Sequence, residues 1–202
     1  MKKLVFALAA CMMLSFSLKD NTLSSAERKK ATDFLKETKK GIWDAISGLS
    51  DEQLKFKPGP DRWSVEECMK HIAQSETMLW QMVDGGLKGP ATPEKRADIK
   101  VTDDDVIKNI EDRSTKVKTF APLEPQNIPL KSTTEAWEAF SKNRDKLVEY
   151  VNSTNDDLRN HVNALPVGSY DSYQMILFIG AHSNRHMQQI NEVKADPNFP
   201  KK

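Results

Sequence analysis

Two of the four histidines in this 202-residue chain, His182 and His186, are four residues apart. On an α-helix, residues with this spacing lie one turn apart on the same face, so their imidazoles are able to bind one metal ion without bending the backbone. The same face carries apolar residues, which predicts that the pair points inward. A buried histidine is more often a hydrogen-bonded core residue than a ligand, because an unpaired buried polar group costs about 1–3 kcal/mol. The spacing alone leaves both interpretations open.

A third histidine, His71, lies at the edge of the apolar stripe of another predicted helix. If that helix neighbours the last one, His71 meets the other two imidazoles across the bundle. Three protein ligands leave a coordination position open, as in catalytic metal sites, and zinc in such a site lowers the pKa of a bound water molecule to about 7. Neutral imidazoles suit Zn, Ni, Fe or Cu, so the set predicts a divalent metal ion without choosing among these elements.

No residue stands out as the general base that would accompany such a metal. Glu67 lies one turn before His71, but its more ordinary role is to cap its own helix. Glu76 lies farther along the same helix. Cys68 is close enough in sequence to approach the metal, although a single cysteine on an apolar helix side is more often a small core residue. The catalytic residues therefore remain unassigned from the sequence.

Four further side-chain types are candidates for a functional or a structural role. Arg185 is a candidate for holding an anionic substrate at the mouth of the site, or for a surface or helix-pairing role. Gln189, one turn after His186, is a candidate for orienting a metal ligand. His161 is interpreted as a loop residue and not as a ligand. The tryptophans are interpreted as core or capping residues, at positions 43, 63, 80 and 137.

The elements that must position the histidines are helices with clear start signals. Capping boxes of the S-x-x-E type occur at Ser24–Glu27 and Ser64–Glu67. The first predicts a helix over about 25–47, and the second a helix over about 65–83 that Gly85-Gly86 ends. Apolar spacing and polar caps predict three more helices, at about 102–120, 133–151 and 171–194.

Stretches rich in proline and glycine separate these helices, and no stretch shows the sustained alternation of a strand. The loop over 87–101 is long enough to be a lid or a binding segment. The chain length favours one domain. We therefore predict an all-α fold over residues 19–202, a four-helix bundle with one additional helix.

The first 18 residues have the features of an export signal. Lys2 and Lys3 precede an apolar run, Leu4–Leu14, that is too short to span a bilayer as a helix. Small residues at Ser15 and Ser17 fit cleavage after this run, which predicts a periplasmic protein. The alternative is a lipobox that ends at Cys11, which predicts a membrane-anchored lipoprotein with a lipid on that cysteine.

Overall charge limits the classes of partner. Lys plus Arg number 30 and Asp plus Glu 29, a net charge of +1. Removal of residues 1–18 takes away two lysines and no acidic residue, so the net charge becomes −1. Neither value favours binding to a phosphate backbone, and we expect no nucleic-acid partner. One cysteine, Cys68, remains after such a cleavage, which excludes an internal disulfide or a dithiol mechanism.

Two segments of the chain resemble the signatures of a known family. Residues 63–76 read WSVEECMKHIAQSE and are similar to the W-S-x-x-E-x-x-x-H signature of the DinB-like (damage-inducible) superfamily. Residues 181–190 read AHSNRHMQQI and are similar to its H-x-x-R-H-x-x-Q-I segment. The resemblance covers about residues 24–196. It implies an up-down-down-up four-helix bundle with a divalent metal held by three histidines, which correspond here to His71, His182 and His186.

The resemblance also implies classes of activity. Some members of the superfamily are thiol-dependent transferases or isomerases, and many are classed as hydrolases without a known substrate. The export signal departs from the thiol-dependent members, since low-molecular-weight thiols are cytosolic cofactors. We therefore expect an exported metal-dependent hydrolase or transferase that acts on an unidentified small molecule. The alternative is a metal- or ligand-binding bundle without turnover. Relatives often form homodimers, but no residue here predicts the interface.

Overall fold

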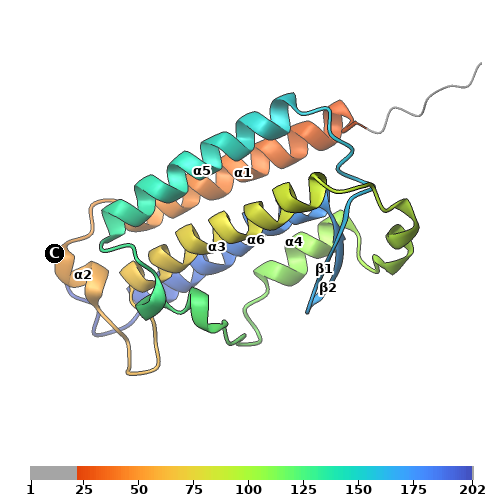
Figure 1. Cartoon of the computed structure of the whole chain (residues 1–202). Helices are drawn as coiled ribbons and strands as arrows, with labels where there is room; N and C mark the ends of the chain where they lie inside the picture. The colour runs from red at the N-terminus through yellow and green to blue at the C-terminus, as the bar shows by residue number, and fades with distance from the viewer. Residues whose placement is uncertain (1–21, 202) are drawn as a thin grey trace, which may run out of the picture.

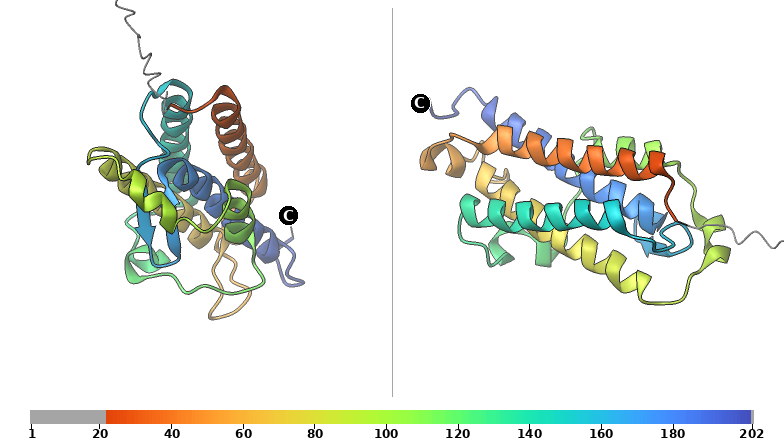
Figure 2. Two further views of the ribbon diagram at one scale, coloured as in Figure 1. Left: turned by 90° about the vertical axis from the view of Figure 1, so that its right-hand side faces the viewer. Right: turned by 90° about the horizontal axis from the view of Figure 1, so that it is seen from above.

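Four long helices lie side by side in the computed structural model, which describes residues 22–201 (Figure 1). They are α1 (Ser25–Ile46), α3 (Val65–Leu87), α5 (Thr133–Ser153) and α6 (Ser172–Lys194). Helices α1 and α6 run in one direction and α3 and α5 in the other, so the order is up-down-down-up. Helices α1 and α5 form one layer and α3 and α6 the other, as the views in Figure 2 show. The predicted bundle is confirmed.

Reciprocal hydrogen bonds at the first turns explain where the helices begin. Ser24 Oγ accepts a hydrogen bond from the Glu27 backbone N–H at 3.2 Å, and the Glu27 carboxylate accepts one from the Ser24 N–H at 2.8 Å. Ser64 and Glu67 make the same two bonds, at 3.1 and 2.8 Å. Both capping boxes read from the sequence are therefore present, and Glu67 caps its own helix as expected.

Helix α3 continues through Gly85-Gly86 and ends at Leu87, so the predicted end near Val83 is wrong. Leu87 is partly buried against the apolar side chains of two neighbouring core clusters. This burial offsets the roughly 1 kcal/mol that a glycine costs in a helix relative to alanine. Tertiary packing therefore sets the end of this helix rather than the two glycines.

Helix α4 (Asp103–Glu111) is the additional helix, and it packs on α6. The prediction that this helix continues through Phe120 is wrong. Helix α4 ends at Glu111, and Phe120 is exposed in an irregular segment. The guanidinium of Arg185, on α6, donates to the backbone carbonyls of Asp112 and Thr115. These contacts hold the chain away from a helical path and lay it across α6.

Short elements connect the long helices. They are α2 (Asp51–Lys55), the 3₁₀ helices η1 (Pro93–Asp98), η2 (Ala121–Leu123) and η3 (Pro125–Asn127), and the strands β1 (Val162–Leu165) and β2 (Gly168–Asp171). The expectation of no strand is wrong, because β1 and β2 pair as an antiparallel hairpin. Each strand has four residues, too few for an alternating pattern to be recognised. Gly168 follows the turn with a φ of 139°, a conformation that glycine adopts without strain.

Apolar side chains of all four long helices form the core. Cys68 is fully buried among them as a free thiol, which confirms its interpretation as a core residue. Trp63 and Trp137 pack against the same cluster. The interpretation of Trp43 as a core residue is wrong, because its side chain is 47% exposed. Its ring lies against that of Trp137, with centroids 4.9 Å apart.

Among residues 22–201, no helix is long and apolar enough to cross a membrane. The predicted export signal, residues 1–18, and the alternative lipobox at Cys11 lie outside the residues that the structure describes. Both stay predictions.

Candidate metal site

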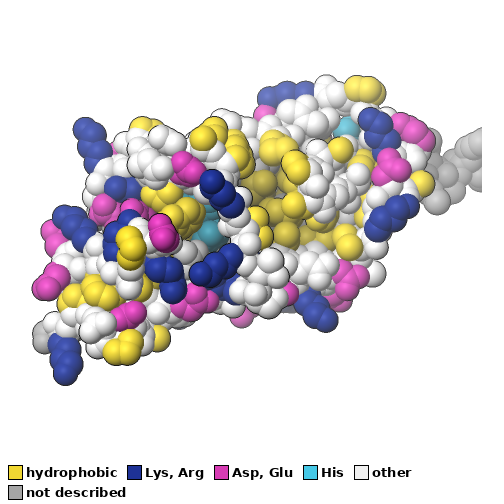
Figure 3. Space-filling view, turned by 90° about the horizontal axis from the view of Figure 1, so that it is seen from below, with side chains coloured by type: hydrophobic (Ala, Val, Ile, Leu, Met, Phe, Trp, Pro, Cys, Tyr) yellow, Lys and Arg dark blue, Asp and Glu magenta, His cyan; other side chains and the backbone are white. Residues whose placement is uncertain are grey.

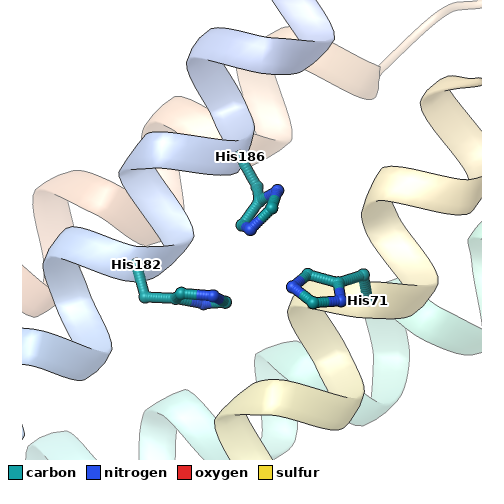
Figure 4. Close-up of side chains that lie close together, drawn as sticks. All are labelled: His71, His182 and His186. Atoms are coloured by element: carbon teal, nitrogen blue, oxygen red, sulfur yellow. The ribbon is translucent and has the colours of Figure 1, made fainter. Parts of the chain in front are cut away.

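Three histidines from two helices converge on one point between α3 and α6 (Figure 4). His71 comes from α3, and His182 and His186 come from successive turns of α6. Each offers one ring nitrogen, and these three atoms all lie within 4.8 Å of one another. The ring centroids are 4.3 to 5.3 Å apart. The convergence expected from the sequence is therefore observed.

Hydrogen bonds fix which ring nitrogen of two histidines is protonated. Nδ1 of His71 lies 2.9 Å from the backbone carbonyl of Leu123, and this oxygen only accepts, so Nδ1 carries the proton. Nδ1 of His186 donates in the same way to Oε1 of Gln189, at 2.9 Å. Both Nε2 atoms are then unprotonated acceptors. A carbonyl or amide oxygen behind the ring is the usual way that a metal-ligating histidine is oriented.

The role expected for Gln189 agrees with this geometry. The carbonyl of Leu123 was not found from the sequence, because a backbone oxygen of the η2 segment leaves no signal in residue types. Ser75 Oγ lies 3.3 Å from Nε2 of His71 and is the only described group that hydrogen-bonds to this atom. No described residue hydrogen-bonds to His182 or to Nε2 of His186, so these nitrogens remain free for a ligand.

Burial keeps all three imidazoles neutral at pH 7. His71 is 2% exposed and His186 is 9% exposed, and burial lowers the pKa of both below the ordinary value. For His186, the neighbouring histidines lower the pKa further. Burial, with His71 and Arg185 nearby, lowers the pKa of His182 to about 3. Neutral imidazoles have the lone pairs that metal binding requires, so no proton has to leave before an ion binds.

Aromatic rings cover two sides of the cluster. The indole of Trp63 is stacked on His186, with centroids 6.0 Å apart and planes at 19°. It also contacts His71, at a centroid distance of 4.9 Å. Phe178 is stacked on His182, at 6.3 Å and 14°. The sequence predicted Trp63 as a core or capping residue, and it does pack against the core at the start of α3. Its contact with the histidines was not predicted.

A pocket of about 480 Å³ opens onto His186. Trp63 and Gln189 line it together with residues 115–119 and 124–126. Figure 3 shows histidine atoms at the floor of a hollow, with basic side chains beside it. Among the described residues, Thr133 Oγ1 is the one fully buried side-chain oxygen or nitrogen without a hydrogen-bond partner. No histidine nitrogen is in that class, so the unpartnered nitrogens of His182 and His186 keep some exposure. The pocket gives a small molecule a path to His186.

Arg185 lines the pocket, but its guanidinium donates to backbone carbonyls, so it is not free to hold an anion with all of its N–H groups. Its NH2 donates to the Thr115 carbonyl at 2.8 Å, and its NH1 donates to the carbonyls of Ile110 and Asp112. These contacts fasten the segment after α4 to the helix that carries two of the histidines. Arg185 thus shapes the outer wall of the pocket.

Neither carboxylate considered as a base reaches the three histidines. Glu67 is held by its cap and by Lys57 at 3.0 Å, and Glu76 is paired with Arg144 in the core. The metal-ligand cluster among the described residues contains histidines alone. His161 lies elsewhere, with Nδ1 2.8 Å from the Asp157 carbonyl, which confirms that it is not a ligand of this cluster.

Comparisons with known proteins agree with this arrangement. The model of the DinB superfamily matches residues 35–190. The uncharacterized protein YuaE of Bacillus subtilis (strain 168) is 28% identical over 153 residues, 75% of this chain and 90% of that protein. The solved structure of YfiT from Bacillus subtilis, described as a probable metal-dependent hydrolase with an unusual four-helix bundle topology, has a TM-score of 0.53 and 16% identity. The similarity covers 89% of this chain and 92% of YfiT. Since the family model spans the bundle and all three histidines, the chain belongs to the DinB superfamily.

Proposed function

We propose that this protein binds one divalent metal ion through His71, His182 and His186 and is a metal-dependent hydrolase. The observation that carries the proposal is the meeting of three neutral imidazoles, from two helices, beside an open pocket that His186 lines. A purely structural cluster would be expected to use up these nitrogens in hydrogen bonds. Here His182 and Nε2 of His186 have no such partner among the described residues.

The donor set fits a divalent ion. Zinc lies 2.0–2.1 Å from each histidine nitrogen, so tetrahedral coordination places the nitrogens roughly 3.4 Å apart. The nitrogens here lie within 4.8 Å of one another, so the rings would have to move together slightly to hold such an ion. Imidazoles without a carboxylate suit Zn, Ni or Fe, and the set does not choose among them. Three protein ligands leave a position open for a substrate or water, as in catalytic sites.

The protein residues prepare the site for hydrolysis. When bound, the metal polarises the bond to be cleaved and lowers the pKa of a water molecule to about 7. Leu123 and Gln189 accept hydrogen bonds from Nδ1 of His71 and His186, which leaves the Nε2 lone pairs of both rings available to hold a metal ion. Trp63 and Phe178 exclude bulk water from the sides of the cluster, which strengthens electrostatic interactions there.

One further finding supports the choice of reaction. YfiT, which has the same fold, is described as a probable metal-dependent hydrolase. A transferase would use a thiol as the nucleophile at the same open position, and it is the alternative that a substrate screen separates from hydrolysis. A bundle that binds metal without turnover is the remaining alternative.

Metal content and a substrate screen test the proposal together. We expect one equivalent of Zn, Ni or Fe in the purified protein, and metal-dependent turnover of an ester or amide in a screen that also includes thiol-transfer substrates. His182→Ala should abolish both. Bound metal with turnover only of thiol-transfer substrates, or with none, would reject the hydrolase. Failure to bind any supplied metal would reject the site.

Residues 1–18 lead us to propose that the site operates after export, in the periplasm or on a membrane. Fractionation of cells that express the full chain tests this location. If Cys11 is a lipid anchor, Cys11→Ser should release the protein from the membrane fraction. Unchanged fractionation would reject the lipobox, and a cytosolic product of full length would reject export.

A further inference from the structure

The charges around the histidine pocket bear on the kind of molecule that enters it. We infer that the pocket takes a small anionic substrate, whose carboxylate or phosphate group lies against the basic rim while its reacting group faces the histidines. The inference rests on the proposed function, because it places the reacting group by the metal. It adds the chemical class of the substrate.

Basic side chains outnumber acidic ones in the pocket lining. The basic residues are Arg62, Arg113, Lys116, Lys118 and Arg185, and the acidic residues are Asp61, Glu124 and Glu192. Imidazole binds a metal in its neutral form, so a divalent ion held by the three histidines would add two positive charges that no protein ligand cancels. The complete site is therefore strongly positive within a protein whose overall net charge is +1. Such a concentration of one sign attracts ligands of the opposite sign.

The three arginines are only partly neutralised. Arg113 binds Glu192 with two hydrogen bonds, at 2.6 and 2.8 Å. Arg62 lies 3.9 Å from the same carboxylate, so two guanidiniums share one acidic group. Arg185 donates to backbone carbonyls, which carry no net charge. An anion in the pocket would thus meet positive charge that the protein does not cancel.

Lys116 and Lys118 are the residues best placed to act on the ligand alone. Both line the pocket, from the segment that Arg185 fastens to α6. Neither makes a hydrogen bond or an ion pair with another described residue, so their ammonium groups are free to bind an anion. Because no protein contact depends on them, their replacement tests ligand binding without disturbing the fold.

The volume of the pocket and its apolar lining residues indicate the size and the apolar character of the rest of the ligand. A volume of about 480 Å³ is in the range of pockets for small molecules. Trp63, Val117 and Pro125 supply apolar surface in the pocket lining. A short carbon skeleton fits between these walls, with its reacting group at one end and its anionic group at the other.

Hydroxamates with matched tails test this inference on the zinc-loaded full chain. The hydroxamate group binds the metal, and the tail extends toward the rim. The probes are the monohydroxamate of succinate, its neutral amide analogue of the same skeleton, and an analogue with a phosphonate tail. We expect calorimetry to show about tenfold tighter binding for the anionic tails, as a charge-assisted contact would give. The tighter of the two anionic probes identifies the source as a carboxylate or a phosphate.

A double variant locates the preference in the pocket. In Lys116→Gln/Lys118→Gln, we expect most of the preference for the anionic tail to be lost, with the amide analogue bound as before. Lys36→Gln/Lys142→Gln is the control, because it removes the same charge from exposed positions on α1 and α5. It should keep the full preference.

The outcomes separate the two proposals. Equal affinity for charged and neutral tails, or equal losses in the two double variants, would overturn the anionic substrate class while the metal site stands. If zinc itself gives no binding signal with the unmodified chain, the proposed function fails and the inference with it.

Discussion

Helices α3 and α6 contribute to two buried polar clusters, one around Arg144 and one formed by the three histidines. The two clusters differ in how many of their polar atoms have a hydrogen-bond partner. Arg144, fully buried on α5, uses all five of its N–H donors on the protein. It binds both carboxylate oxygens of Glu76 at 2.7 Å, and the remaining partners are Leu35 O, Thr38 Oγ1 and Ser183 Oγ, at 2.9, 2.7 and 3.0 Å. These partners come from α1, α3 and α6, so the cluster joins all four long helices. The histidine cluster leaves His182 and Nε2 of His186 without a hydrogen-bond partner among the described residues.

The difference shows how burial of polar groups reveals a role. A cluster that satisfies itself, such as Glu76 and Arg144, is complete without a ligand and serves to fix the bundle. A cluster that keeps acceptors free beside a pocket is incomplete without one. The first cluster also supports the second, because Glu76 follows His71 on α3 and Ser183 follows His182 on α6. Each prediction below asks whether the two clusters respond differently.

Breaking the Arg144 cluster should have the largest effect. Arg144→Met leaves the buried Glu76 carboxylate without its partner, and we expect a loss of about 3–5 kcal/mol in the free energy of unfolding. Denaturant titration with and without metal measures it. Lys146→Met is the control, since this side chain is exposed on the same helix. A loss in Arg144→Met no greater than in the control would show that this cluster does not hold the bundle together.

Removing the support of one ligand should have an intermediate effect, on metal binding. Gln189→Ala takes away the acceptor for Nδ1 of His186, and we expect metal affinity to fall about 10–100-fold. The stability of the metal-free protein should change little. Gln188→Ala is the matched control, because Gln188 bonds to the Glu111 carbonyl and not to a histidine. Equal metal affinity in the two variants would mean that Gln189 does not orient the ligand.

Acid should lower the stability of the metal-free protein through the histidine cluster, and the expected effect of each histidine is smaller than those above. The lowered pKa values keep His71, His182 and His186 neutral in the folded chain, whereas each gains a proton in the unfolded chain below about pH 6.5. Stability of the metal-free protein should therefore fall as the pH drops from 6.5 to 5.5, by about 1 kcal/mol for each of His182 and His186, whose pKa values are lowered furthest. His182→Asn should make the fall shallower. A pH dependence identical in this variant would exclude His182 as a source.

Much of the fold and of the histidine site, but not all of either, could be predicted from the sequence. The capping boxes at Ser24 and Ser64 predicted two helix starts, because these contacts lie within four consecutive residues. The spacing of His182 and His186 predicted their shared face for the same reason. Convergence with His71 depends on how two helices pack, and periodicity does not specify that. The family resemblance supplied it, and the structure agrees.

The errors arise where distant residues decide local structure. Helix α4 stops at Glu111 because Arg185, far along the chain, binds the backbone that follows. The role of Arg144 was also missed, although a signal exists. Arg144 falls in the apolar stripe of α5 together with Phe140, Leu147 and Val151. A charge within an apolar stripe predicts a buried partner.

Metal binding by the histidine cluster is the central claim, and competitive zinc titration of the full chain and of His182→Ala tests it most directly. We predict one zinc ion per unmodified chain, with stability raised by about 2.7 kcal/mol at a free concentration of one hundred times Kd. His182→Ala should lose this gain while keeping the helical content of the unmodified protein. If the variant binds zinc as tightly as the unmodified chain, or the unmodified chain binds none, the account is contradicted.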